Sequence, residues 1–294
     1  MLKNILVPLD GSGAAEIVMP YAEEIAAKSS GNMFLVMAVG PQPKDTGSEQ
    51  SYLDQATEKA KARLRSYGVD PLNRISAQLL QESPADAIQH HADQANADLI
   101  VMASRGSTNQ GPWLLGSIAS RVTMASARPV LVIKKAAQNT AIEQKKIFKK
   151  IMITLDGSPC GEEALPQAQE LARLTGAELI LFHAVEPIAS WTGYGVGASY
   201  IDTAEPENVG TGASTYLEDV RNRLAGTGLN IKTVLVEGSP ADLIVDYAKT
   251  HSVDTIAIST HGRSGVSRWV FGSVTEKVLQ HGEPAVLVVH ACKI

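Results

Sequence analysis

The chain has 294 residues, of which 44% are hydrophobic and 19% are charged, and its net charge is −5. This composition is typical of a globular protein with a sizeable core, and the acidic balance argues against nucleic-acid binding, which normally needs a basic surface. No apolar run approaches the roughly 18 residues of a membrane span, and no signal peptide precedes the first apolar run, so we expect no membrane partner. With two cysteines in the chain, Cys160 and Cys292, we expect reduced thiols and a cytoplasmic protein.

The first half of the chain alternates apolar runs with helical patterns. Strands are predicted at 4–9, 33–39, 74–80, 98–103 and 130–134, and helices at 14–28, 50–67, from 83 onward and at 118–127. Because parallel neighbours need a crossover connection, strands that alternate with helices indicate parallel pairing. The pattern predicts an α/β fold in which a five-stranded parallel sheet is doubly wound.

The second half repeats this pattern. Three segments recur: ILVPLDGS, ESPAD and PVLVI, which begin at 5, 82 and 129, reappear as IMITLDGS, GSPAD and PAVLV, which begin at 151, 238 and 284. A self-similarity of about 150 residues indicates domain duplication, since solenoid repeats have periods of roughly 20–50 residues. We predict one domain at 1–136, a linker at 137–148 and a second domain at 149–294.

The predicted elements of the second domain follow the same order. Strands are expected at 150–155, 178–185, 231–236, 254–259 and 285–289, and helices at 160–175, 213–226, 240–251 and 273–281. The longest irregular segment, 187–211, is rich in glycine and contains Trp191, Tyr194 and Tyr200. A loop of this length is either functional or disordered. Two interpretations stay open, a mobile insertion and a surface for a protein partner or lid.

A glycine-bearing loop follows the fourth strand of each domain. The first reads Ala103-Ser104-Arg105-Gly106 and, after nine residues, Gly116-Ser117; the second reads Ser259-Thr260-His261-Gly262 and, after nine residues, Gly272-Ser273. A helix is predicted to start at each Gly-Ser pair. Its N-terminus presents unpaired N–H groups and the positive end of the helix dipole, which suits a phosphate group.

The serines at these helix starts have a second interpretation. Ser273-Val-Thr-Glu276 matches a capping box, in which the serine closes its own helix, whereas Ser117 has Ser120 in place of the glutamate. Arginines near the loops, Arg105 and Arg263, are within reach of an anionic ligand.

An aspartate ends the first strand of each domain, Asp10 and Asp156. Ligands of open parallel sheets bind outside the carboxyl ends of the strands, where a carboxylate suits a ribose hydroxyl pair or a magnesium ion. In the alternative interpretation, each aspartate caps the turn formed by the Gly-Ser that follows it.

Several familiar motifs are absent from the sequence. It has no Gly-x-x-x-x-Gly-Lys-Ser/Thr loop, no Gly-x-Gly-x-x-Gly after the first strand and no Gly-x-Ser-x-Gly elbow. The histidines are scattered, so no protein-bound metal site is predicted. No general base or lysine clamp is evident, so any transfer or hydrolysis of a phosphate group should be slow or nil.

On these motifs the chain resembles the universal stress protein family in its tandem form. The family signature is Gly-x2-Gly-x9-Gly-Ser/Thr; Gly106, Gly116 and Ser117 match it, as do Gly262, Gly272 and Ser273. Ala103 and Ser259 replace the first glycine. The resemblance implies the strand order 3-2-1-4-5 in each domain and ATP as the ligand, with or without Mg²⁺.

The resemblance also implies which residues bind the nucleotide. The aspartates would lie at the ribose, the residues that end the second strands would offer backbone groups to the base, and the loops would contact the triphosphate. The candidates are Pro8, Asp10, Ala38, Ala103, Arg105, Gly106, Gly116, Ser117 and Ile118 in the first domain, and Thr154, Asp156, Ala184, Ser259, His261, Gly262, Arg263, Gly272, Ser273 and Val274 in the second.

The function implied by the resemblance is that of an ATP-binding regulator or sensor in a stress response, with a protein partner that the sequence does not identify. Two alternatives stay open, a slow ATPase and a nucleotide-free scaffold. Members of the family pair domains through their last strands, so we expect an internal pseudo-dimer through 130–134 and 285–289, with a homodimer as a further option.

Overall fold

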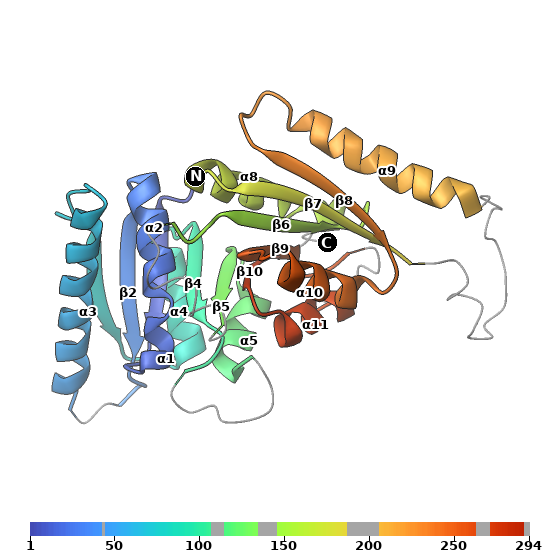
Figure 1. Cartoon of the computed structure of the whole chain (residues 1–294). Coiled ribbons are helices and arrows are strands. Elements are labelled where there is room, and N and C mark those ends of the chain that lie inside the picture. The colour runs from blue at the N-terminus through green and yellow to red at the C-terminus, as the bar shows by residue number, and fades with distance from the viewer. Residues whose placement is uncertain (43–44, 107–114, 135–145, 187–205, 263–270, 291–294) are drawn as a thin grey trace.

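The computed structural model describes residues 1–42, 45–106, 115–134, 146–186, 206–262 and 271–290 (Figure 1). The first domain contains β1 (Asn4–Leu9), α1 (Gly13–Glu16), α2 (Met19–Ser29), β2 (Asn32–Ala38), α3 (Gly47–Ser66), β3 (Ile75–Leu80), α4 (Pro84–Gln94), β4 (Leu99–Ala103), α5 (Ser117–Ala125) and β5 (Val130–Ile133). The second contains β6 (Lys150–Leu155), α7 (Pro159–Glu162), α8 (Leu165–Thr175), β7 (Glu178–Val185), α9 (Pro206–Arg223), β8 (Ile231–Glu237), α10 (Pro240–Thr250), β9 (Thr255–Ser259), α11 (Ser273–His281) and β10 (Ala285–Val289). Every predicted strand is present, and its ends lie within one residue of the prediction.

The helices show two differences from the prediction. The single helices expected at 14–28 and 160–175 are each broken, into α1 and α2 and into α7 and α8. In both copies a proline, Pro20 or Pro166, stands at the start of the second piece. Proline has no N–H and its ring clashes with the carbonyl four residues back, so the helix restarts there. The segment predicted irregular at 187–211 is helical from Pro206 onward, and 187–205 lies outside the described residues.

The strands form one ten-stranded sheet in the order β3-β2-β1-β4-β5-β10-β9-β6-β7-β8. Each domain therefore has the predicted order 3-2-1-4-5 with parallel neighbours. The domains meet where β5 and β10 pair antiparallel, with Leu131 opposite Leu287, as Figure 1 shows. Every residue of these two strands is buried. A free edge would leave the backbone N–H and C=O groups of these apolar strands unpaired. Their antiparallel pairing satisfies these groups and confirms the predicted internal pseudo-dimer.

Helices cover both faces of the sheet. α2, α3, α8 and α9 pack over one face, and α4, α5, α10 and α11 over the other. The first layer is continuous between the domains, because Ile147 and Phe148, at the end of the predicted linker, are buried within it. The Phe148 ring lies 5.7 Å from the ring of Tyr21 in an edge-on arrangement, and the Ile147 N–H donates to the Glu24 carboxylate at 2.7 Å.

Lys134 and Glu23 are buried side chains whose pKa values are strongly shifted. Lys134, which follows β5, donates through Nζ to the carbonyls of Val278 at 3.0 Å and Gly282 at 2.6 Å, at the end of α11. Burial lowers the pKa of Lys134 to about 7. On α2, burial raises the pKa of Glu23 to about 7, and Arg63 at 3.6 Å opposes that rise. Both groups therefore differ in pKa between the folded and unfolded chain, so each links stability to pH.

The described residues bear on two expectations from composition, one about membrane-spanning segments and one about the cysteines. No described helix is long and apolar enough to cross a bilayer. Cys160 is disulfide-bonded, so the expectation of a reduced thiol is wrong at this position, while Cys292 lies outside the described residues.

Candidate functional site

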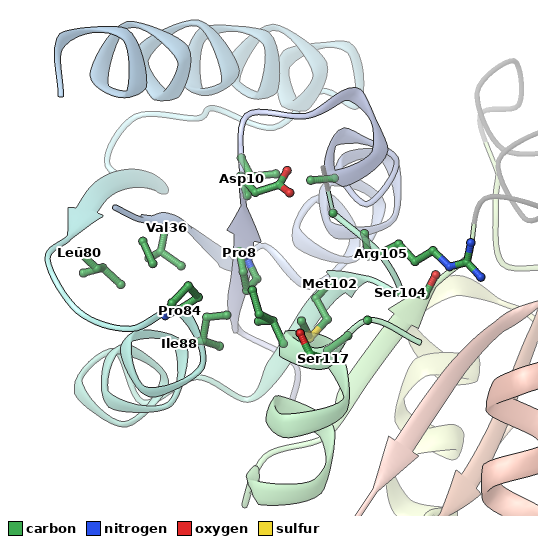
Figure 2. A pocket seen from close by; sticks show the side chains of 18 residues that line it. Pro8, Asp10, Val36, Leu80, Pro84, Ile88, Met102, Ser104, Arg105 and Ser117 are labelled. Atoms are coloured by element: carbon green, nitrogen blue, oxygen red, sulfur yellow. The ribbon is translucent and has the colours of Figure 1, made fainter. Parts of the chain in front are cut away.

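A cavity of about 460 Å³ opens at the carboxyl edge of the first domain's sheet (Figure 2). Its walls come from the ends of β1, β2, β3 and β4 and from the first turns of α4 and α5. The lining residues are Pro8, Leu9, Asp10, Ala15, Val36, Ala38, Leu80, Pro84, Ile88, Met102, Ala103, Ser104, Arg105, Gly106, Gly116, Ser117, Ile118 and Ala119. The volume lies within the range of small-molecule sites, which are concave, mostly apolar and equipped with a few polar groups.

The carboxylate of Asp10 is held at the mouth of this cavity by the turn that follows β1. Gly11 has a φ of +79°, which lets the chain reverse at once. Ser12 donates to Asp10 Oδ1 through its N–H at 3.0 Å and its hydroxyl at 2.5 Å. The capping interpretation of Asp10 therefore accounts for one carboxylate oxygen.

The other oxygen of Asp10 faces the glycine loop. A Cβ added to Gly106 would lie 2.1 Å from Asp10 Oδ2, so any larger residue at 106 would push this carboxylate out of its present position. The close approach brings the end of β1 and the loop after β4 to one side of the cavity. Glycine at position 106 thus permits a close contact between two elements that are far apart in the sequence.

Backbone hydrogen bonds of Ser104 close the glycine loop. The Ser104 N–H donates to the Ile133 carbonyl at 2.8 Å, and the Ser104 carbonyl accepts from the Gly116 N–H at 2.7 Å. Residues 107–114 lie outside the described part of the chain. This closure sets the N-terminus of α5 against the carboxyl end of β4, so its free N–H groups border the cavity.

The N-termini of α5 and α11 show that the two serines do not cap their own helices. Gly116 and Gly272 occupy the N-cap positions, Ser117 and Ser273 are the first helical residues, and neither helix has a side-chain cap hydrogen bond. The predicted capping box at Ser273 is therefore wrong, because the glycine before it takes the cap position. Both serines are exposed.

All nine candidate residues of the first domain line the cavity. The Arg105 side chain extends away from its centre (Figure 2). The apolar floor, made by Val36, Leu80, Ile88 and Met102, was missed. The Ser-Pro helix start at 83–84 was the available signal, since it places the first turn of α4 at the same sheet edge as the glycine loop.

The second domain has the same backbone frame. Ser158 donates to Asp156 Oδ1 through its N–H at 2.9 Å and its hydroxyl at 2.7 Å. A Cβ on Gly262 would lie 2.2 Å from Asp156 Oδ2. The Thr260 N–H donates to the Val289 carbonyl, and the Gly272 N–H to the Thr260 carbonyl, each at 2.9 Å. Asp156 and Gly262 therefore repeat the arrangement of the first domain.

Side chains around the second frame are different. The Thr154 hydroxyl, where the first domain has Pro8, donates to the Ala257 carbonyl at 3.4 Å. The Ser259 hydroxyl donates to the Gly161 carbonyl at 3.2 Å, and His261 Nδ1 lies 3.1 Å from the Thr260 hydroxyl. These polar groups bond within the protein. Ala184 and Val274 are partly buried, and Arg263 lies outside the described residues.

A tyrosine close to each aspartate was also missed by the sequence analysis. Burial, and then the nearby Glu16 and Asp10, raise the pKa of the Tyr52 phenol. Burial, and then the nearby Glu162 and Asp156, act in the same way on the pKa of Tyr216. Each phenol therefore lies in a partly buried, acidic environment close to its aspartate.

The first-domain cavity combines an apolar floor, a carboxylate at the mouth and a helix N-terminus. An apolar ring system fits the floor, a hydroxyl fits the carboxylate, and an anion fits the N–H groups of the helix. Among the described residues, no group of three or more His, Cys, Asp or Glu side chains is placed to hold a metal ion.

Comparisons with known proteins identify the family of the chain. The model of the universal stress protein family matches residues 1–134 and 147–290. Universal stress protein YxiE of Bacillus subtilis is 33% identical over 148 residues, covering 49% of this chain and 99% of that protein. Universal stress protein Slr1230 of Synechocystis is 25% identical and covers 95% of this chain and 96% of its own length.

A solved structure supports the fold at full length. The crystal structure of a universal stress protein from Archaeoglobus fulgidus covers 99% of both chains with a TM-score of 0.67 and 19% identity. Since the family model matches each half of the sequence separately, the chain belongs to the universal stress protein family and carries two domains of that family in tandem.

Proposed function

We propose that the protein is a cytoplasmic, ATP-binding regulator or sensor in a stress response. One observation carries the proposal: the Asp10 carboxylate lies directly against Gly106, so that a side chain at 106 would displace it, at the cavity where α5 begins. A glycine kept against a carboxylate at the mouth of an apolar cavity is expected of a built ligand site, whereas a structural turn would need only the Ser12 contacts.

Each part of ATP has a matching group in the first domain. The adenine fits the apolar floor and the backbone of Ala38, and the ribose hydroxyls fit Asp10. The phosphates fit the N–H groups of Ser117 and Ile118 in the first turn of α5, where the helix dipole favours negative charge. Mg²⁺, if it accompanies ATP, would neutralise the phosphates and approach the Asp10 carboxylate.

Regulation would follow from a difference in affinity between two states of the protein. ATP shifts an equilibrium only if it binds one state better than the other, so binding should alter the affinity for a protein partner or for a second copy of the chain. Nothing in the cavity requires turnover.

Isothermal titration of the purified full-length protein with ATP, with and without Mg²⁺, tests the proposal. We expect saturable binding below millimolar concentration and a raised melting temperature, since a ligand that binds only the folded state stabilises it. GTP is the matched control for base recognition. No binding and an unchanged melting temperature would favour the nucleotide-free scaffold. Fast phosphate release that is lost in Asp10→Asn would favour an ATPase.

A further inference from the structure

Val36 forms part of the floor of the first-domain cavity. It lies on β2 beside Pro8 of β1 and belongs to the buried cluster under α4 and α5. Figure 2 shows it on the same side of the cavity as Leu80, with Ile88 across the floor. The small isopropyl group leaves the depth of the cavity open.

The second domain has a phenyl ring at this position. Phe182 lies on β7 beside Thr154 of β6, which is the register of Val36 beside Pro8. Phe182 is 1% exposed and belongs to the same buried cluster, here under α10 and α11. Its ring lies 5.2 Å from the ring of Tyr247 on α10.

The other floor positions do not offset this larger side chain. The sequence repeat places Val236, Ile244 and Ile258 where the first domain has Leu80, Ile88 and Met102. One position is unchanged in size, one is smaller by a single carbon atom, and one exchanges an unbranched side chain for a branched one. The phenyl ring is therefore a net addition to the floor.

The core explains how the second domain accommodates the ring. In the first domain the aromatic residue of this strand is Phe34, whose ring lies 6.3 Å from that of His91. Its counterpart in the second domain is Ile180. Side chains two residues apart on a strand point the same way and lie about 7 Å apart. The large side chain thus stands one step nearer the carboxyl edge in the second domain, at the position of the cavity floor instead of the partly buried position of Phe34.

We infer that the two domains are not equivalent sites: the first binds the nucleoside, and Phe182 fills the space that a base would need in the second. The second domain keeps the Asp156 and Gly262 frame without a floor deep enough for adenine. This inference rests on the proposed function and predicts one ATP per chain rather than two.

Titration of the full-length protein with ATP measures this stoichiometry. We expect one site in the wild type and none in Gly106→Val. Phe182→Val should raise the stoichiometry to two, and Val36→Phe should abolish binding. Phe34→Val is the matched control for Phe182→Val. It also replaces a phenyl ring by an isopropyl group, but in the first domain and one step further from the carboxyl edge, and it should leave one site.

The outcomes separate the inference from the proposed function. No ATP binding by the wild type refutes the proposed function. Two sites in the wild type, or one site that survives in Gly106→Val, overturn the inference and leave the proposed function standing. A folded Phe182→Val protein that still binds one ATP also overturns it. If Phe182→Val does not fold, the comparison of wild type with Gly106→Val still decides the question.

Discussion

Replacement of Gly106 by alanine tests the site by adding a single methyl group. The new Cβ would lie 2.1 Å from Asp10 Oδ2, whereas real Cβ contacts stay above 3.0 Å, so the carboxylate must move by at least 0.9 Å. Asp10 is exposed and can move, but the movement disturbs its contacts with Ser12 and takes it away from the ligand.

The expected loss in affinity is that of one charged hydrogen bond. Such a bond contributes about 1.5–3 kcal/mol, which corresponds to a roughly 10- to 150-fold increase in Kd. Folding should change little, because the displaced group is on the surface. Isothermal titration with ATP gives the Kd, and thermal melting gives the stability.

Gly13 provides the matched control for this substitution. No atom lies within 4 Å of a Cβ added to Gly13, which is the first residue of α1. Gly13→Ala should keep wild-type affinity and leave stability equal or higher, by up to about 1 kcal/mol. Wild-type affinity in Gly106→Ala, or an equal loss in both variants, would refute the role assigned to the contact between Gly106 and Asp10.

Four further predictions concern packing, pH (two of them) and the helix start. Phe148→Ala should lower the free energy of unfolding by about 3–5 kcal/mol, because Phe148 is fully buried between the domains; urea denaturation measures this, and a loss below about 1 kcal/mol would contradict it. The amine of Lys134 loses its proton near pH 7 when folded but near 10.5 when unfolded, so stability should rise between these values by up to about 1.4 kcal/mol per pH unit, and Lys134→Met should remove that rise. The carboxyl of Glu23 has a pKa of about 7 when folded and 4.5 when unfolded, so stability should fall over that range, and Glu23→Gln should abolish the fall in denaturation curves recorded across it. Ser117→Ala should change stability by less than about 0.5 kcal/mol while weakening ATP binding, because Gly116 holds the cap position; a loss near 1 kcal/mol in thermal melting would indicate a capping role instead.

The strands and the duplication could be predicted because both depend on local patterns. The run 99–103 is apolar throughout and its counterpart 255–259 has an apolar centre at 256–258, as expected of parallel strands covered on both faces. The repeated LDGS segments place an aspartate at the end of each first strand. The joining of the last strands was implied by the family resemblance, and the burial of every residue in β5 and β10 gives its physical reason.

Other features depended on particular residues that the apolar periodicity and the motif matches did not take into account. The break between α1 and α2 follows from Pro20, a local signal that was overlooked. The capping box at Ser273 matched by type but was displaced by the glycine before it. A match of residue types therefore predicted the helix end within one residue, while the cap itself required the backbone geometry.

The sequence alone determined the α/β class, the two domains and the glycine loops after the fourth strands, because each depends on a pattern of residues that are contiguous in the chain. The tertiary structure decided what surrounds those loops. Val36, Ile88 and Gly106 line one cavity only because strand and helix ends from separate segments converge at one sheet edge. In the sequence, Val36 and Phe182 are an ordinary difference between the two copies. Only the structure shows that Val36 lines the cavity, so that the size of the residue at this position matters for binding.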